Sequence, residues 1–320
     1  MYGDIKLYTC SGNPELADKI AAYLKQPQAG RDILHYPNDN IGVRLHDSAR
    51  GQDVYVIQSM SRPVHANIFE LLIMLQTLRL DSAGRITAVI PYLAYGRSDK
   101  KDQPRVPIAA RLMADMIEVA GADRYMTLDL HAGQLQGFFS IPGDVLTAFH
   151  IIVDYIKGQM HTLPDPVVVT TDLGFAKRGR NFAEQIGAPL ALIEKRRQIR
   201  TGVGTEALNI VGDVAGRDVL LVDDEVDTAG SVSEAVSLLK EQGARSITLI
   251  FVHAVLSDPA ADRLAALPLD EIITTDTIEI PAEKRAKIGK KLTVLSVAPL
   301  LGEVILRAHE GRSVGEMFNE

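Results

Sequence analysis

The feature that most constrains the fold of this chain is a regular alternation of short apolar runs with longer segments of helical period. The apolar runs are rich in β-branched residues and indicate strands at 53–58, 85–92, 124–131, 166–172, 218–224 and 246–254. Apolar residues recur with helical spacing between them, most clearly at 66–80, 106–121, 179–187 and 231–243. Strands that are apolar throughout and alternate with helices form a parallel sheet covered on both faces. We therefore predict an α/β protein.

The length of 320 residues favours two domains over one. The segment 149–166 ends in a proline-rich connection, after which a second series of strands and helices begins. We predict an N-terminal domain over 1–146 and a C-terminal domain over 147–295, each with a mainly parallel sheet flanked by helices. The last stretch, 296–320, includes a helix that we expect to pack back on the first domain.

Composition excludes several classes of function. A formal charge of −7 argues against nucleic acid as a partner, because sequence-independent binding rests on many contacts between basic residues and phosphates. The apolar runs are far shorter than the roughly 18 residues that cross a bilayer, so no membrane segment is expected. Cys10 is the single cysteine, and the N-terminus lacks the pattern of a signal peptide. We predict a cytoplasmic protein.

One apolar run ends in an unusual number of acids. The stretch LLVDDEVDTAGSVSEAV, residues 220–236, passes from strand type through four carboxylates and small residues into a segment of helical spacing. Ligands of open parallel sheets gather beyond the carboxyl ends of the strands. Carboxylates accept hydrogen bonds from ribose hydroxyls, and a helix N-terminus offers N–H groups to a phosphate. The same pattern also fits a simple helix cap with solvated acids.

The block VLLVDDEVDTAGS, residues 219–231, resembles the 5-phosphoribosyl-1-diphosphate (PRPP) signature, which phosphoribosyltransferases share with ribose-phosphate diphosphokinase, also called PRPP synthetase. Further blocks at 11–24, 91–124, 127–144, 188–197 and 293–305 resemble PRPP synthetase alone. The resemblance covers almost the whole chain. It implies two phosphoribosyltransferase-like domains and transfer of the diphosphoryl group of ATP to the anomeric hydroxyl of ribose 5-phosphate, with Mg2+ as cofactor.

The resemblance also implies roles for individual residues. Lys195 and Arg197 match catalytic cations of a flexible loop, and the Gly- and Thr-rich segment 198–210 that follows is consistent with a lid. The residues implied to bind ribose 5-phosphate are Asp223, Asp224, Asp227, Thr228, Ala229, Gly230 and Ser231. A surface basic turn is the alternative for the two cations.

Metal and nucleotide positions follow from the same blocks. Asp129 and His131 stand two apart and so point to the same side at a strand end, and the resemblance places both near Mg2+, with His131 also on the nucleotide phosphates. Asp172 matches an aspartate beside a second Mg2+. Arg97 matches an arginine that contacts ATP, and its planar fork suits a phosphate or a base.

The resemblance to the family is weakest at the positions expected to contact the nucleobase. An early hairpin of the family carries an aromatic residue, then an acid or amide and then a glutamate, whereas this chain has Tyr36, Asn38 and Asn40 in HYPNDNIGVRL. Ser98 also replaces a common glutamine. The resemblance implies that these positions contact the nucleotide. Their altered chemistry leaves two possibilities, which are ATP bound differently or another nucleoside triphosphate.

Three hypotheses therefore remain from the sequence. The leading one is a PRPP synthetase; the second is a weakly active or regulatory paralog within PRPP synthetase assemblies; the third is a phosphoribosyltransferase that consumes PRPP. Because the early hairpin of the family acts in a neighbouring subunit, we expect a homo-oligomer, hexameric by resemblance.

Overall fold

The computed structural model describes residues 2–171, 174–200 and 203–317, and for 195–200, 203–208 and 316 it describes the backbone alone. Contacts between residues divide the chain into two compact units. Unit 1 contains residues 2–147, 277–279 and 296–317, and unit 2 contains residues 280–295 together with the described part of 148–276.

Unit 1 is built on a parallel sheet with the strand order β1-β4-β5-β6-β7 and a separate antiparallel hairpin, β2-β3. The strands are β1 (Ile5–Thr9), β2 (Arg31–His35), β3 (Ile41–Leu45), β4 (Asp53–Ile57), β5 (Arg85–Ile90), β6 (Arg124–Leu128) and β7 (Gly143–Leu146). The helices are α1 (Pro14–Leu24), α2 (Val64–Leu80), α3 (Ala109–Ala120) and α9 (Ala298–Glu310), with short 3-10 turns η1 (Gly133–Phe138) and η4 (Gly315–Met317).

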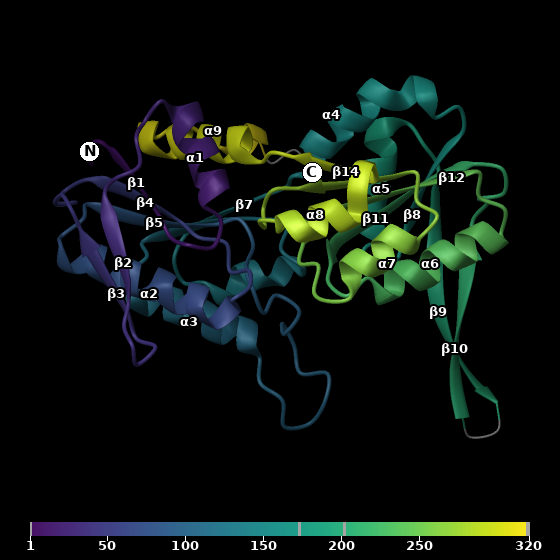
Figure 1. The fold of residues 1–320 in the computed structure, drawn as a ribbon, viewed down its shortest axis with the longest axis horizontal. Coiled ribbons are helices and arrows are strands. Elements are labelled where there is room, and N and C mark those ends of the chain that lie inside the picture. The colour runs from purple at the N-terminus through teal and green to yellow at the C-terminus, as the bar shows by residue number, and fades with distance from the viewer. Residues whose placement is uncertain (1, 172–173, 201–202, 318–320) are drawn as a thin grey trace. The chain divides into compact units, whose positions relative to one another are not determined.

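Helices cover both faces of this sheet. In Figure 1, α1 and α9 lie together on one side of the strands and α2 and α3 on the other. Local sequence explains where α1 begins: Asn13 accepts a hydrogen bond from Leu16 N at 3.2 Å, and Pro14 occupies the first turn, where its missing N–H is not needed. The C-terminal helix α9 therefore belongs to the same compact body as the first strands of the chain.

Unit 2 contains a larger sheet with the order β10-β9-β8-β11-β12-β13-β14, parallel except for the β9–β10 pair. Its strands are β8 (Pro166–Thr170), β9 (Leu190–Arg200), β10 (Val203–Val211), β11 (Asp218–Val226), β12 (Ser246–Ala254), β13 (Glu271–Thr275) and β14 (Leu292–Leu295). The helices are α4 (Phe149–Gln159), α5 (Ala176–Ile186), α6 (Gly230–Glu241), α7 (Ala260–Ala266) and α8 (Ala282–Ile288), with 3-10 turns η2 (Met160–Thr162) and η3 (Gly289–Lys291).

The core of unit 2 shows why β11 is continuously apolar in its first half. Val219 and Leu221 pack in one cluster with residues of α6 and α7, and Leu220 and Val222 are fully buried as well. On α4 and α5, Phe149 and Phe182 meet edge to face with their ring centroids 5.7 Å apart. A strand covered by helices on both faces has no side that tolerates polar residues.

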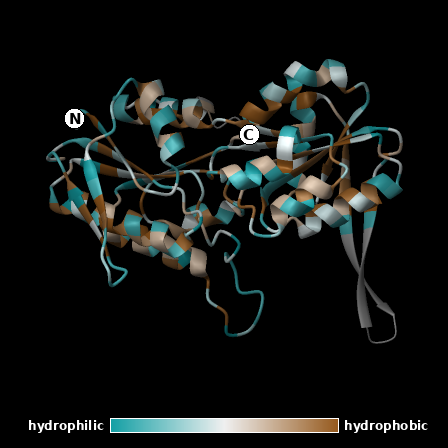
Figure 2. Ribbon diagram, viewed as in Figure 1, coloured by the Kyte–Doolittle hydropathy of each residue, from teal (hydrophilic) through white to brown (hydrophobic). Residues whose placement is uncertain are grey.

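These sheets confirm the predicted α/β class, and Figure 2 shows hydrophobic residues concentrated on the strands, with mixed faces on the surrounding helices. The described residues of the segment expected to form a lid, 198–200 and 203–210, belong to β9 and β10, which pair antiparallel and extend beyond the other strands of their sheet (Figure 1). Within the described ranges, none of the helices has the length and apolar character needed to cross a bilayer.

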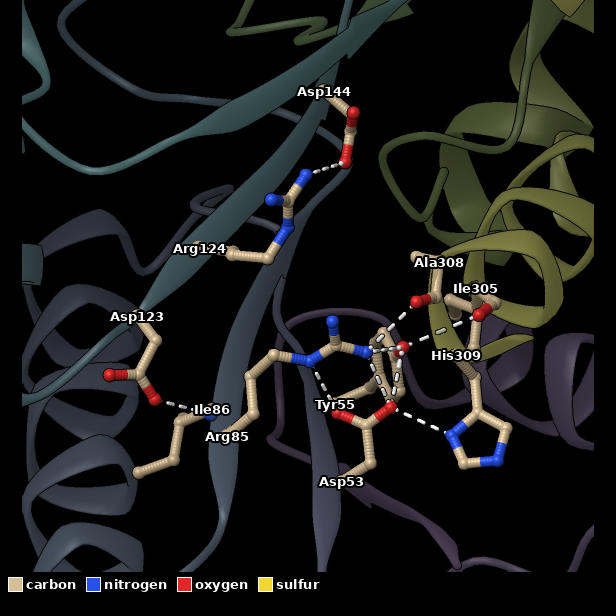
Figure 3. Close-up of polar contacts among 10 residues, drawn as sticks. All are labelled: Asp53, Tyr55, Arg85, Ile86, Asp123, Arg124, Asp144, Ile305, Ala308 and His309. Atoms are coloured by element: carbon tan, nitrogen blue, oxygen red, sulfur yellow. Dashed lines mark hydrogen bonds and ion pairs between the residues drawn. The ribbon is translucent and has the colours of Figure 1, made fainter. Parts of the chain in front are cut away.

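A buried ionic network holds α9 to the sheet of unit 1 (Figure 3). Asp53 opens β4, is 0% exposed, and receives hydrogen bonds from Arg85 Nε at 2.7 Å and Arg85 Nη2 at 2.6 Å. His309 Nδ1 lies 2.8 Å from the same carboxylate, and Arg85 also donates to the carbonyl of Ala308 at 3.1 Å. Tyr55 donates to Asp53 at 3.0 Å. The buried carboxylate of Asp53 is thereby surrounded by donors, as a buried charge requires.

Because removing one partner of a buried pair leaves the other charge uncompensated, Arg85→Ala should lower the free energy of unfolding by about 3–5 kcal/mol. The control Arg44→Ala removes an arginine whose side chain is 71% exposed and pairs with Asp32, and should lower it by less than about 1 kcal/mol. Urea denaturation of the two variants and the wild type measures both. Equal losses in the two variants would contradict the importance assigned to the Asp53 network.

Candidate active site

The acidic residues of β11 lie where this strand extends beyond the end of β8. The pairing with β8 stops at Val222 opposite Thr170, whereas the pairing with β12 continues to Val226 opposite Ala254. Residues 223–226 are therefore strand residues with one neighbour beyond the end of β8. This is the carboxyl end of a central parallel strand, the edge at which ligands of such sheets bind.

The carboxylate of Asp223 lies in a poorly solvated place beside the charge of Asp224. Its Oδ2 accepts a hydrogen bond from Thr171 Oγ1 at 2.7 Å, and its Oδ1 accepts one from the backbone N–H of Asp224 at 2.9 Å. Burial raises the pKa of Asp223 well above the carboxyl range, the negative charge of Asp224 raises it further, and the bond from Thr171 opposes both. Asp224, which is 5% exposed, accepts a hydrogen bond from the N–H of Glu225 at 2.9 Å.

The turn after the strand combines an acceptor with a set of donors. Asp227 Oδ1 is buried and receives no hydrogen bond from the described residues. Ala229 adopts the left-handed conformation, with φ 58°, and α6 begins directly after it at Gly230 without a side-chain cap. The first N–H groups of a helix have no acceptor within the helix, so those of Gly230 and Ser231 are available to an anion.

This arrangement can hold a phosphorylated sugar. Carboxylates accept hydrogen bonds from neighbouring hydroxyls, and N–H groups at a helix N-terminus bind phosphate oxygens while the helix dipole favours their charge. Asp223, Asp224 and Asp227 supply acceptors, and residues 228–231 supply the turn and the donors. The structure thus brings together all seven residues that were predicted for ribose 5-phosphate.

A second group of predicted residues lies at the carboxyl ends of β5 and β6 in unit 1. Asp129 follows β6 directly, is 5% exposed, and accepts a hydrogen bond from Thr147 Oγ1 at 2.8 Å. A Cβ added at Gly96 would lie 3.6 Å from the Cβ of His131, so the turn that carries Arg97 runs beside this histidine. Both His131 and Arg97 are exposed. Parallel neighbouring strands bring these positions to one edge of the sheet.

Ser98 accepts hydrogen bonds from the first turn of α3. Its Oγ accepts a hydrogen bond from Ala109 N at 3.1 Å, and its carbonyl accepts one from Ala110 N at 3.2 Å, so it closes the start of α3. The hydroxyl hydrogen is not used in that bond. Asp99 beside it accepts from Gln134 Nε2 at 2.5 Å, a link to η1 that the sequence did not suggest.

The β2–β3 hairpin presents the other predicted nucleotide residues. A hollow of about 440 Å³ at its tip is lined by Tyr36, Pro37, Asn38 and Asn40. Asn38 Oδ1 accepts from the N–H of Asn40 at 3.3 Å, and the Tyr36 ring, 48% exposed, crosses Gly42, where any Cβ would come within 2.9 Å of its hydroxyl. The tip therefore combines an aromatic face with two carboxamides.

Lys195 and Arg197 occupy β9 at positions paired with Leu208 and Glu206 of β10. Their side chains, like the whole of Asp172, lie outside the described residues. Among the described side chains, no three His, Cys, Asp or Glu residues converge as a set of metal ligands.

Two contacts of the segment 223–231 are not indicated by the sequence. Thr171, at the end of β8, reaches Asp223, and Arg263 of α7 donates from Nη1 to the carbonyl of Thr228 at 2.9 Å. For Thr171 the position at a strand end was the available signal, whereas nothing in the spacing of the chain pointed to Arg263.

Known proteins resemble this chain over most of its length. Residues 5–121 match the family model of the N-terminal domain of ribose phosphate pyrophosphokinase, and residues 201–319 match that of the phosphoribosyl synthetase-associated domain. A ribose-phosphate pyrophosphokinase of Caldanaerobacter subterraneus is 45% identical over 98% of both chains, and one of Wolinella succinogenes is 42% identical over 98% of both. The crystal structure of phosphoribosylpyrophosphate synthetase from Mycobacterium smegmatis superposes with a TM-score of 0.91 at 40% identity, covering 96% of this chain and 99% of that one.

Because the pKa of Asp223 is raised, replacing its carboxyl group should stabilise the protein by an amount that depends on pH. The folded state keeps a proton that the unfolded state releases, so the free energy of unfolding of the wild type falls as pH rises from the ordinary carboxyl range to the raised pKa of Asp223. Asp223→Asn keeps an acceptor for Thr171 without the charge. The free energy of unfolding of the variant should exceed that of the wild type by at least about 1 kcal/mol at pH 8 and by much less at about pH 4.5.

Urea denaturation at the two pH values measures this difference, with Asp213→Asn as the matched control, because Asp213 is an exposed carboxylate of the same unit. A gain that is the same at both pH values, or that appears equally in the control, would rule out the proposed origin in Asp223.

Proposed function

The chain belongs to the ribose-phosphate pyrophosphokinase family, and we propose that it transfers the diphosphoryl group of ATP, or of another nucleoside triphosphate, to the anomeric hydroxyl of ribose 5-phosphate. The products are PRPP and the nucleoside monophosphate. The observation that carries this proposal is the acidic end of β11 joined through a left-handed turn to an uncapped helix, in a chain that matches its relatives over nearly their whole length.

In the proposed complex, the carboxylates of Asp223 and Asp224 accept hydrogen bonds from the ribose hydroxyls. The N–H groups at the start of α6 bind the 5-phosphate, with Thr228 and Ser231 adding hydroxyl donors. Asp227 Oδ1, which has no partner among the described residues, supplies a further acceptor beside the sugar. This binding fixes the anomeric hydroxyl in one position, and fixed geometry is a large part of what catalysis of phosphoryl transfer requires.

The donor side of the reaction needs positive charge. Diphosphoryl transfer spreads negative charge over the phosphate oxygens, and preorganised cations stabilise it. By resemblance we assign this role to Lys195 and Arg197 on the β9–β10 hairpin, with Lys195 acting in the transition state and Arg197 contacting the transferred phosphates.

A divalent cation fits the carboxylates and imidazole of this chain. Mg2+ is commonly held by one or two carboxylates together with substrate phosphates and water, so it does not require a complete cluster of protein ligands. Asp129 and His131 would hold it with the nucleotide, and Asp172 would serve a second ion near the ribose. When bound, Mg2+ would neutralise negative charge on the phosphates.

For the nucleotide, we propose contacts with Tyr36, Asn38 and Asn40 of the hairpin and with Arg97, Ser98 and His131 at the edge of the first sheet. The Tyr36 ring offers a stacking face to a base. A carboxamide donates as well as accepts hydrogen bonds, whereas a carboxylate only accepts, so Asn38 and Asn40 can pair with a carbonyl as readily as with an amino group. This is why the donor is left open between ATP and another nucleoside triphosphate.

The same hairpin favours one alternative function. If its changed chemistry prevents nucleotide binding, the chain would act as a regulatory paralog in PRPP synthetase assemblies. The retained ribose-phosphate turn argues against that alternative. A phosphoribosyltransferase that consumes PRPP is a weaker alternative, because the turn alone would permit it.

We further propose a cytoplasmic homo-oligomer, hexameric by resemblance, in which the β2–β3 hairpin serves a neighbouring subunit. The exposed apolar residues Phe69, Leu112 and Val119, on α2 and α3, support self-association. Sedimentation equilibrium distinguishes this assembly from a monomer.

The proposed function is tested by incubating the purified protein with ribose 5-phosphate, Mg2+ and, in turn, ATP, GTP, CTP or UTP. With at least one of the four donors, we expect PRPP to form. Each PRPP should be accompanied by one nucleoside monophosphate. Absence of PRPP with all four donors would favour the regulatory alternative. Consumption of added PRPP with a nucleobase would favour the phosphoribosyltransferase.

In the same assay, Lys195→Ala should lower turnover by at least about two orders of magnitude, as the loss of a preorganised cation does. Lys290→Ala, which removes an exposed lysine after α8, is the control and should leave turnover unchanged. Turnover near that of the wild type in Lys195→Ala would remove this residue from the catalytic assignment.

A further inference from the structure

The carbonyl of Thr228 is held by a side chain from another part of unit 2. Arg263 lies on α7, which follows the next strand after α6, and its Nη1 donates to Thr228 O at 2.9 Å. A Cβ added at Gly230 would lie 3.6 Å from the same nitrogen. The guanidinium group therefore lies against the turn at the point where the left-handed residue leads into α6.

This contact matters because it orients a peptide group of the turn at the point where α6 begins. Ala229 is in the left-handed conformation, which costs a residue with a Cβ about 1–2 kcal/mol, and no side chain caps α6 at this position. In a trans peptide the C=O and the following N–H point in opposite directions. Fixing the carbonyl of Thr228 toward Arg263 therefore fixes the N–H of Ala229 on the opposite side of the turn.

The helix that carries Arg263, α7, is fixed by contacts on two sides. Ala260, Ala261 and Leu264 bury one side of α7 in the core of unit 2. On its outer side, Asp262 pairs with Lys287 of α8 at 2.9 Å. Arg263 thus projects from a helix that is fixed on two sides, and its own side chain is exposed, so it can be changed without disturbing the core.

We propose that Arg263 is a positioning residue for the phosphate of ribose 5-phosphate. Its hydrogen bond keeps the 228–231 turn in the conformation that presents backbone N–H groups to the phosphate, and its positive charge lies next to the same turn. It acts through the backbone of Thr228 and not by contact with the reacting atoms. This inference rests on the proposed function, since it concerns the site proposed there for the ribose phosphate.

The test is calorimetric titration of ribose 5-phosphate into the wild type, Arg263→Ala, Arg263→Lys and Lys287→Ala, together with steady-state kinetics. Arg263→Ala should weaken binding of ribose 5-phosphate and raise its KM by about 10- to 100-fold, the range for losing a hydrogen bond from a charged group. The kcat and the KM of the nucleotide should change by less than about twofold, and Tm should not change, because the side chain is exposed.

Arg263→Lys keeps a charged donor and should restore much of the affinity. Lys287→Ala removes one positive charge from the neighbouring helix, where it pairs with Asp262, and should bind ribose 5-phosphate as the wild type does. The inference is overturned if Arg263→Ala binds normally, if Lys287→Ala weakens binding equally, or if weaker binding comes with a lower Tm that lysine does not rescue. A wild type that binds ribose 5-phosphate but forms no PRPP would refute the proposed function alone.

Discussion

Burial of Asp223 beside Asp224 is the interaction on which the rest of this site depends. A strand covered on both faces places its last residues in a poorly solvated environment, and there two adjacent carboxylates repel each other. Folding alone gives no reason to keep such a pair. A ligand with several hydroxyl groups does, because each carboxylate oxygen has two lone pairs and can accept a further hydrogen bond from it.

The other end of the same strand shows what a structural carboxylate looks like. Asp218 opens β11, receives hydrogen bonds from Arg245 and from Ser246 Oγ at 2.7 Å, and the arginine lowers its pKa to about 2. Asp53 at the start of β4 is paired with Arg85 in the same manner. The amino ends of β4 and β11 thus carry carboxylates paired with arginine, which stabilise the fold, whereas the carboxyl end of β11 carries the adjacent acids that we assign to the ligand.

The sequence predicted the α/β class because β11 and α6 have clear strand and helix periods. It did not predict the β9–β10 hairpin, since charged residues interrupt the apolar pattern of LALIEKRRQIR after its first half. Ser98 was read as a nucleotide contact, and its role at the start of α3 depends on a backbone group eleven residues away. Arg263 could not be found, because its contact with Thr228 spans 35 residues and two secondary-structure elements. Local patterns reveal elements, whereas contacts between elements require the fold.

The central claim is that the acidic end of β11 and the start of α6 together hold a phosphorylated pentose. A crystal structure of the protein with ribose 5-phosphate tests it most directly. We expect the ribose hydroxyls within hydrogen-bonding distance of the carboxylates of Asp223 and Asp224, and the phosphate oxygens on the N–H groups of residues 229–231. A pentose bound at any other edge of the sheet, or a phosphate away from this turn, would contradict the claim.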